Sequence, residues 1–512
     1  MSGGMKVLNS EDCLVESGGF GKFQWLILLF GAIGLQGGNF FVYNMSLLLK
    51  MPGFECRSDV SKPFERCERE NICRAEQMID RNLWRTDFEG GGLDNSEVSF
   101  HNWMTDQELY CLDSYMIGLF GSAYFLGYAL NGIIIKQADR FGRKKIIIFG
   151  SIIQVICSFI LFFTTNIYLK YVTLFFMGIG MCKAVVIYIL CTEMFPQKNR
   201  MKAGSFILNI KYSFAMLITC SYFLSGGKHI NNIMILALFF SVLSLILSFI
   251  IPDSPKYFYE KKMFKELRST LEQISKINGV SFDQKNVRFQ NESTKVISKS
   301  RQDTKPSVKD AGNSEASEEN YSVLKDLKNP LTVQNLICIA TCFSIVGFNY
   351  YLLGYYTKYI KGNIFYNMLA STIADSAGTF LLGSVHKYLG TKRAFLMLII
   401  CESLCFSLLL YFKQGMILTL ILFMIVCLMG GIYPLIYNLI SEIFSPLFVP
   451  FTFSICNIAS RGVTILAPQI AELKPREIPI ITLIFSCCIA AFAMVNLRTD
   501  SKLDVAKSKK TD

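Results

Sequence analysis

The sequence has few charged residues and few histidines for its length. Only 18% of its 512 residues are Asp, Glu, Lys or Arg, against about 25% in ordinary soluble domains. Several soluble domains could not cover their surfaces with so few charges. The three histidines form no catalytic triad or metal-ligand pattern, so the sequence argues against an enzyme and predicts no metal or cofactor. No Gly-x-x-x-x-Gly-Lys-Ser/Thr loop is present, which argues against ATP as a direct source of energy.

Apolar residues are abundant instead. They make up 52% of the sequence, and the mean hydropathy is +0.38. Seven long apolar runs contain no Asp, Glu, Lys or Arg, and five more contain one or two. Helices of about 20 apolar residues cross a bilayer, whereas barrel strands alternate between apolar and polar residues. The sequence therefore predicts an all-α membrane protein with twelve transmembrane helices, of which the third covers Ile146–Leu169.

Charge indicates the side of the membrane on which each loop lies. The loop 136–145 holds five Lys or Arg residues, a density typical of cytoplasmic loops. The net charge of +12 is then explained by such loops rather than by nucleic-acid binding. The predicted order is a cytoplasmic N-terminus without a signal peptide (1–22), a six-helix half (23–251) with a long outer loop (51–113), a partly disordered cytoplasmic connector (252–330), a second half (331–497) and a basic cytoplasmic tail (498–512).

An internal repeat supports two halves. The segment around Gly142 resembles the segment around Gly390, and Tyr188 to Glu193 resembles Tyr437 to Glu442 at nearly the same offset. Two motifs at one offset indicate two pseudo-symmetric six-helix halves, which is the major facilitator fold.

A charged turn joins the second and third predicted helices. It reads Asp139-Arg140-Phe141-Gly142-Arg143. A tight turn between antiparallel helices favours glycine at position 142. The charged side chains could bridge helix ends and act as a gate on the cytoplasmic side. The alternative is a simple cytoplasmic anchor.

The gate is expected to include charges at the end of the fourth helix. Glu193 and Arg200 flank this end, and we expect both to join Asp139 and Arg143 in one ionic latch. Glu442 repeats Glu193, but no basic residue lies between Phe444 and Ser460. The second latch is therefore expected to use Lys392 or Arg393. The alternative is a set of solvated loop charges.

Four cysteines lie in the predicted outer loop: Cys56, Cys67, Cys73 and Cys111. An even number of cysteines on the oxidising side of a membrane predicts two disulfides. Three pairings are possible, and the sequence does not choose among them.

Five charged residues fall well inside the apolar runs: Lys183, Lys211, Asp375, Glu402 and Arg461. Each costs about 2.5–3.5 kcal/mol at the centre of a membrane helix, so we expect them to face a cavity or one another. The alternatives are structural pairing, for instance of Arg461 with Asp375, and snorkelling of Lys211 toward the membrane surface.

Several motifs together resemble the organic cation, organic anion and carnitine transporter family. They are Pro52-Gly-Phe-Glu-Cys56, Leu109-Tyr-Cys111, Pro252-Asp-Ser-Pro-Lys-Tyr257, Tyr350-Tyr351 and Ser460-Arg461-Gly462. Ile135 and Lys387 depart from the superfamily pattern, which has Gly and an acid there.

The resemblance implies a binding cavity and a substrate charge. Tyr188, Thr192, Tyr350, Tyr351 and Arg461 would line the cavity. Family members that take anions or carnitine tend to carry Arg at the place of Arg461, and cation carriers tend to carry Asp. Lys183 and Asp375 are further substrate-binding candidates. Because Tyr350 and Tyr351 are adjacent on a helix, they point about 100° apart, which favours only one of them facing the cavity.

The sequence thus predicts a secondary active or facilitative transporter of a small organic anion or zwitterion that works by alternating access. It is expected to be a monomer in the lipid bilayer, in the plasma membrane rather than an internal one, and to have a coupling ion as a second partner. Two alternatives are a sugar-type porter, which labelled hexose uptake would reveal, and a receptor or scaffold that binds ligand without flux.

Overall fold

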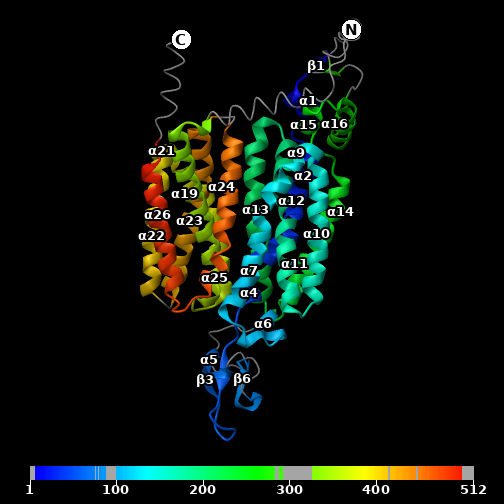
Figure 1. Ribbon diagram of the computed structural model, residues 1–512. Coiled ribbons are helices and arrows are strands. Elements are labelled where there is room, and N and C mark those ends of the chain that lie inside the picture. Colours follow the sequence, from blue (N-terminus) through cyan, green and yellow to red (C-terminus); the bar gives the residue numbers. More distant parts are fainter. Residues whose placement is uncertain are drawn as a thin grey trace.

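The computed structural model describes residues 6–74, 77–78, 80–87, 100–282, 287–290, 292, 326–412, 415–445 and 448–498. In this part of the chain, twelve helices are long and apolar enough to cross a membrane. They stand side by side in one bundle (Figure 1). We call the end of the bundle that carries β1 and α21 the terminal end, and the end that carries β3 and β6 the loop end.

The first half has six spans. They are α2 (Lys22–Gly34), α3 (Gln36–Tyr43) and α4 (Met45–Leu48); α7 (Ser114–Ala129) and α8 (Asn131–Ile135); α10 (Arg143–Phe163); α11 (Ile167–Gly180) and α12 (Cys182–Glu193); α13 (Gln197–Leu224); and α14 (Asn231–Ile250). The short α9 (Gln137–Phe141) precedes α10.

The third span ends at Phe163, earlier than predicted. The reason is Asn166, whose side chain accepts hydrogen bonds from the backbone N–H groups of Tyr168 and Leu169 and caps α11.

The second half also has six spans. They are α19 (Pro330–Tyr356) with η4 (Thr357–Tyr359); α20 (Ile364–Leu381), η5 (Leu382–Ser384) and α21 (His386–Leu389); α22 (Thr391–Tyr411); α23 (Met416–Ile443); α24 (Val449–Thr464) and α25 (Ala467–Ala471); and α26 (Ile478–Asn496).

The two halves repeat one another in detail. Gly142 and Gly390 have positive φ angles of 99° and 78° and begin α10 and α22, which both have 21 residues. The same pair of spans is in closest contact in each half. A Cβ on Gly127 would lie 1.9 Å from the carbonyl oxygen of Phe175, and one on Gly378 would lie 1.9 Å from that of Cys427. The predicted fold, with its two pseudo-symmetric halves, is therefore present.

The halves meet from mid-bundle toward the loop end. The hydroxyl of Ser122 in α7 donates to the carbonyl oxygen of Ile465 at 2.7 Å. The Ser213 and Ser376 hydroxyls of α13 and α20 lie 3.1 Å apart. Toward the terminal end, α8 and α24 also approach each other, since a Cβ on Gly132 would lie 3.2 Å from the side chain of Ile458. The bundle is thus closed at its loop end.

The described residues of 51–113 form a small disulfide-bonded unit below the bundle (Figure 1). Its elements are β2 (Phe54–Cys56), β3 (Glu65–Cys67), α5 (Arg69–Ile72), β4 (Cys73–Arg74), β5 (Gln77–Met78), η1 (Arg81–Leu83), β6 (Trp84–Thr86), α6 (Trp103–Asp106) and η2 (Leu109–Cys111). β2 pairs with β3 and β6 in an antiparallel sheet. Disulfides join Cys56 to Cys67 and Cys73 to Cys111, which is one of the three pairings that the sequence left open.

We expect these disulfides to be intact in the native protein. Peptides from 51–113 should be linked in pairs under non-reducing mass spectrometry and separate after reduction. Loss of the Cys73–Cys111 bond in a Cys73→Ser/Cys111→Ser variant should cost about 2–5 kcal/mol of unfolding free energy. Four freely alkylated thiols in unreduced protein would contradict both the bonds and the predicted outer location.

A second small unit covers the terminal end of the first half (Figure 1). Its elements are β1 (Lys6–Leu8), α1 (Ser10–Glu16), α15 (Pro255–Glu260), α16 (Phe264–Asn278) and β7 (Val287–Phe289). β1 pairs in parallel with β7, and Leu8, Cys13, Leu267, Leu271 and Phe289 share a buried apolar core. We call this unit the cap. It contains part of the predicted connector; the polar stretch predicted to be disordered lies mainly outside the described residues.

Candidate functional site

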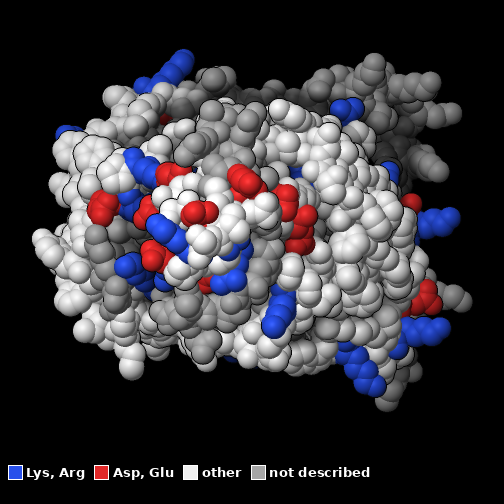
Figure 2. Space-filling view, turned by 90° about the horizontal axis from the view of Figure 1, so that it is seen from below, with Lys and Arg blue, Asp and Glu red and all other residues white. Residues whose placement is uncertain are grey.

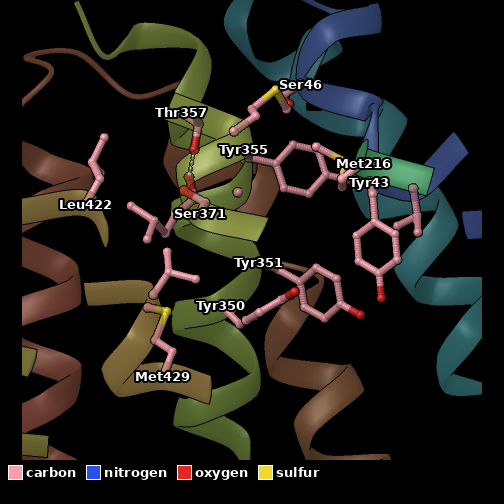
Figure 3. A pocket seen from close by; sticks show the side chains of 15 residues that line it. Tyr43, Ser46, Met216, Tyr350, Tyr351, Tyr355, Thr357, Ser371, Leu422 and Met429 are labelled. Atoms are coloured by element: carbon pink, nitrogen blue, oxygen red, sulfur yellow. Dashed lines mark hydrogen bonds between the residues drawn. The ribbon is translucent and has the colours of Figure 1, made fainter. Parts of the chain in front are cut away.

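A small cavity lies between the two halves near the centre of the bundle (Figure 3). Its volume is about 60 Å³. Tyr350, Tyr351 and Tyr355 of α19 reach it from one half, and Tyr43 and Ser46 of the first span reach it from the other. The remaining walls are mainly Met, Leu and Val side chains. Both adjacent tyrosines therefore line the cavity, whereas the sequence favoured one.

Arg461 of α24 lies beside this cavity in a set of aromatic rings. Its guanidinium carbon is 4.3 Å from the ring centre of Tyr128 and 5.7 Å from that of Tyr351. Tyr351 thus belongs both to the cavity and to the surroundings of Arg461. Tyr433 and Tyr437 of α23 are also close enough to act electrostatically on the guanidinium. These contacts are cation–π in kind, and they come from both halves, since Tyr128 lies in α7.

No carboxylate of the described residues lies within ion-pairing distance of Arg461. The pairing of Arg461 with Asp375, one of the alternatives from sequence, is therefore not seen. Asp375 lies in α20, where its charge acts on Tyr43. Lys211 of α13 acts electrostatically on Tyr128 and Tyr351, as Arg461 does. The centre of the bundle thus holds two cations and one acid on different helices.

Two of the charged residues predicted from sequence lie away from the cavity. Lys183 is fully buried within the first half, where its ammonium donates to the Ser244 hydroxyl at 3.0 Å. Glu402 is buried among the second-half helices and accepts a hydrogen bond from Asn349 at 3.4 Å. The sequence alone does not show that these two side chains point away from the cavity, because the helices that carry them have no polar face to indicate a direction. The structure does not bring Lys183 to the predicted substrate site.

Tyr188 and Thr192 also lie outside the cavity lining. Both pack near Gly204 of α13: a Cβ at that glycine would lie 2.9 Å from the Tyr188 hydroxyl and 3.4 Å from the Thr192 methyl. The Thr192 hydroxyl is occupied, since it donates to the backbone oxygens of Tyr188 and Ile189.

A buried ion pair closes the loop end. The Lys358 ammonium lies 2.6 Å from the Glu472 carboxylate, and their side chains are only 1% and 4% exposed. Lys358 also donates to the carbonyl oxygen of Leu49 in the first half, at 3.3 Å. The Tyr359 hydroxyl donates to Glu472 as well. We call Lys358, Tyr359 and Glu472, with the Leu49 carbonyl, the loop-end latch; no signal in the sequence distinguished it from ordinary charges at helix ends.

The disulfide-bonded unit adds a more exposed link between the halves. Glu70 of α5 pairs with Lys474, which follows α25. Burial and the neighbouring guanidinium groups of Arg476 and Arg69 lower the pKa of the Lys474 amine. Viewed from the loop end, most of the surface is uncharged, and the basic and acidic side chains gather on the part that projects toward the viewer (Figure 2).

At the terminal end, the charged turn after α9 contacts the end of α12. Arg143 pairs with Glu193 at 3.1 Å, and its backbone N–H donates to the Asp253 carboxylate at 3.1 Å. Asp253, which the sequence analysis noted only as part of a motif, also fills the space beside Gly142. Arg140 lies over the ring of Phe141. The side chain of Asp139 lies outside the described part of the structure.

Two other latch predictions differ from the structure. Arg200 pairs with Glu11 of the cap at 2.7 Å rather than with the charged turn, because α1 folds back over the start of α13. The Glu442 carboxylate accepts a hydrogen bond from the Thr391 hydroxyl at 2.6 Å. Lys392 instead donates to the backbone oxygens of Val495 and Leu497, because α26 ends beside it.

The described residues contain no group of three or more His, Cys, Asp or Glu side chains that could hold a metal ion. The chemistry available at the centre is therefore that of charged groups, aromatic rings and hydroxyls. Such a set can bind and orient a small ion.

Residues 102–468, more than half of the chain, match the sequence profile of the Major Facilitator Superfamily. The chain belongs to this superfamily. Its members are membrane transporters, which agrees with the prediction of a transporter rather than an enzyme. The fold is shared with the xylose transporter XylE from E. coli in its inward-open conformation, with a TM-score of 0.60 over 93% of this chain and 95% of that one. At 14% sequence identity, this likeness shows the fold alone.

Curated relatives confirm the resemblance to the organic cation and carnitine carriers. Organic cation/carnitine transporter 2 of Rattus norvegicus is 27% identical over 191 residues, which are 36% of this chain and 34% of that protein. The human protein of the same name is 25% identical over 190 residues, and solute carrier family 22 member 4 of Mus musculus is 25% identical over 198 residues; both alignments cover 36% of this chain and 34% of the relative. The alignments span about a third of each relative's length.

Proposed function

We propose that this protein carries a small organic anion or zwitterion across a membrane by alternating access, with Arg461 as the residue that binds the substrate's carboxylate. The observation that carries this proposal is the state of Arg461. It is a cation near the middle of a membrane span, surrounded by tyrosines, beside a central cavity, and without a carboxylate partner in the described residues. Arginine stays charged in such a place, so a carboxylate substrate would supply the missing anion.

The rest of the cavity fits an organic ion better than an inorganic one. Tyr350, Tyr351, Tyr355 and Tyr43 offer flat apolar faces with hydroxyl edges. Lys211 adds a second positive charge to the same region. At about 60 Å³, the cavity is smaller than the roughly 300–1,000 Å³ of common ligand sites, so substrate binding would require it to widen toward the terminal end.

The names of the relatives agree with an organic substrate. Two of them are called organic cation/carnitine transporter 2, and carnitine carries both a carboxylate and a quaternary amine. We propose that the protein works as a monomer. The disulfide-bonded unit at its loop end needs an oxidising exterior, which supports the plasma membrane as its location. A coupling ion would be its second small partner.

Counterflow in proteoliposomes tests the proposal. Purified protein would be loaded with an unlabelled aromatic carboxylate and exposed to the labelled compound, then tested with a matched trimethylammonium cation, a betaine-type zwitterion and a hexose. We expect exchange of the carboxylate or the zwitterion. Exchange of the cation alone, or of the hexose alone, would contradict the substrate assignment. Ligand binding without any exchange would favour a receptor or scaffold.

The contact between Arg143 and Glu193 is proposed to stabilise the terminal end during transport. Glu193→Gln leaves Arg143 without its ionic partner, and we expect about a tenfold lower transport rate, since about 1.4 kcal/mol changes a conformational population tenfold. Asp139→Asn in the same turn should act likewise. Substrate affinity, measured by binding, should stay close to that of the unmodified protein, because Glu193 does not line the cavity and the turn that carries Asp139 lies at the terminal end.

Unchanged flux in both variants, at equal surface expression, would contradict a gating role. Lys198 is an exposed cation at the start of α13, and Lys198→Gln serves as the control for a general loss of surface charge.

A further inference from the structure

Asp375 of α20 lies close both to the central cavity and to a contact between the halves. It follows Ser371, which lines the cavity, by one helical turn of α20, so the two residues share a helix face. The next residue, Ser376, makes the 3.1 Å hydroxyl contact with Ser213 of the first half. Asp375 therefore lies beside the cavity and next to a contact that must break when the halves separate.

The groups around Asp375 offer it no fixed cation. From α23, Gly430 packs against the backbone of Asp375, and Cys427 is close enough for the charge of Asp375 to act on its thiol. From α3, Tyr43 faces it. From α13, the nearest contact is that of Ser213, and the one charged group on the facing stretch is Lys211, whose ammonium acts on Tyr128 and Tyr351. No basic side chain of the described residues lies within ion-pairing distance of Asp375.

An unpaired carboxylate in such a place is costly. Asp375 is half-buried, so its carboxylate has lost part of its hydration without gaining a cation, which costs free energy, and a carboxyl group in such surroundings avoids this cost by taking up a proton. In the conformation described here, closed at the loop end, a neutral Asp375 lets α20 pack against α13. An ionised Asp375 would favour a wetter, separated arrangement of these two helices.

We propose that Asp375 binds a coupling proton that travels with the substrate. This inference rests on the proposed transport function and adds the ion that drives it. The proton binds the carboxylate when the cavity is open at the loop end, and its binding permits α13 and α20 to close. After the cavity opens at the terminal end, water reaches the carboxyl group and the proton leaves. When the substrate is a singly charged anion, one proton accompanies one carboxylate, so the step is electrically neutral.

Glu402 is the matched control. It is also an acid in a membrane span without a cation in ion-pairing distance in the described structure. However, it is buried among α19, α22 and α26 and bound to Asn349, away from the contact between the halves. Glu402→Gln and Asp375→Asn are the same chemical change in two different places.

The test uses the full chain in proteoliposomes with a trapped pH-sensitive dye and a labelled aromatic carboxylate. In the unmodified protein, an inward proton gradient should accelerate uptake, and uptake should acidify the lumen. In Asp375→Asn, gradient-driven accumulation should fall at least about tenfold and the acidification should disappear, while exchange at equal pH on the two sides should fall far less. Glu402→Gln should keep both gradient-driven uptake and acidification.

The outcomes separate the two proposals. Exchange without any response to the gradient in the unmodified protein would overturn the proton assignment and leave the transport function standing. Loss of gradient-driven uptake in Glu402→Gln but not in Asp375→Asn would also overturn it. Absence of exchange in the unmodified protein would contradict the transport function and this inference with it. Asp375→Glu, which keeps an acid, should retain coupling and shows whether the position tolerates substitution.

Discussion

Replacing Arg461 with lysine is expected to lower carboxylate uptake by about tenfold or more, and replacing it with aspartate to abolish uptake. Lysine keeps the positive charge but loses the planar fork that binds a carboxylate with two parallel hydrogen bonds. Aspartate reverses the charge beside the cavity. Uptake of the labelled carboxylate, corrected for the amount of protein at the surface, measures both effects.

Tyr128→Phe provides a control for the surroundings of Arg461. It keeps the ring that lies 4.3 Å from the guanidinium carbon and removes only the hydroxyl, so transport should change much less than in Arg461→Lys. If Arg461→Lys reaches the surface normally and carries the carboxylate as fast as the unmodified protein, bidentate binding at this residue is wrong. Failure of both Arg461 variants to reach the surface would indicate a structural role instead.

Breaking the loop-end latch should shift the protein toward a conformation open at that end. Removing one partner of a buried ion pair costs about 3–5 kcal/mol because the other charge remains unpaired. For Glu472→Gln, Lys358 would be left buried beside the Leu49 carbonyl. If this free-energy cost applies only to the conformation closed at the loop end, the ratio of the open to the closed population rises by more than a hundredfold. We therefore expect slow transport and a cavity that is accessible from the loop end.

Labelling of a cysteine at Ser46 reports this accessibility. Ser46 lines the cavity and is 3% exposed, so Ser46→Cys should react slowly with a membrane-impermeant maleimide in the unmodified background and quickly with Glu472→Gln. The four cysteines of the disulfide-bonded unit are already paired and add no background.

A double variant tests whether charge burial is the cause. Lys358→Met/Glu472→Leu replaces both ions with apolar groups, an exchange that is often neutral or stabilising. It should restore slow labelling of the Ser46 cysteine. Equally fast labelling in the single and double variants would show that closure does not depend on the state of this pair.

The sequence predicted the framework well because a membrane imposes a simple requirement on it. Twelve apolar stretches, the repeated glycines at 142 and 390 and the charged turn were sufficient for the fold. Arg461 and Asp375 were recognisable because a charge inside an apolar run is conspicuous. Tyr128 and Tyr43 were missed because tyrosines in apolar runs give no such signal. Lys183 lies in the first half, away from the cavity; the sequence does not show the direction of its side chain, because lipid-facing and protein-facing sides of these helices are equally apolar.

Contacts between residues far apart in the chain could not be predicted from the sequence either. Nothing near Arg200 in the sequence points to Glu11, and nothing near Lys392 points to the end of α26. Glu11 and the end of α26 come close to Arg200 and Lys392 only in the folded protein, where the packing of whole helices brings these segments together at the terminal end. The loop-end latch was missed for the same reason, since Lys358 and Glu472 read as ordinary charges at the ends of two spans.

The cap has a consequence for the order in which the chain can fold during synthesis. β1 is made first, but its partner β7 follows the sixth span, and the Asn278 side chain accepts a hydrogen bond from the backbone N–H of Phe23 at the start of the first span. The first strand can therefore pair only after the chain as far as Phe289 has left the ribosome. Once β7 has left the ribosome, the cap can form on the first half. The next span, which begins at Pro330, has not yet been translated at that point. The six-helix half and its cap thus form a natural cotranslational folding unit onto which the second half is assembled.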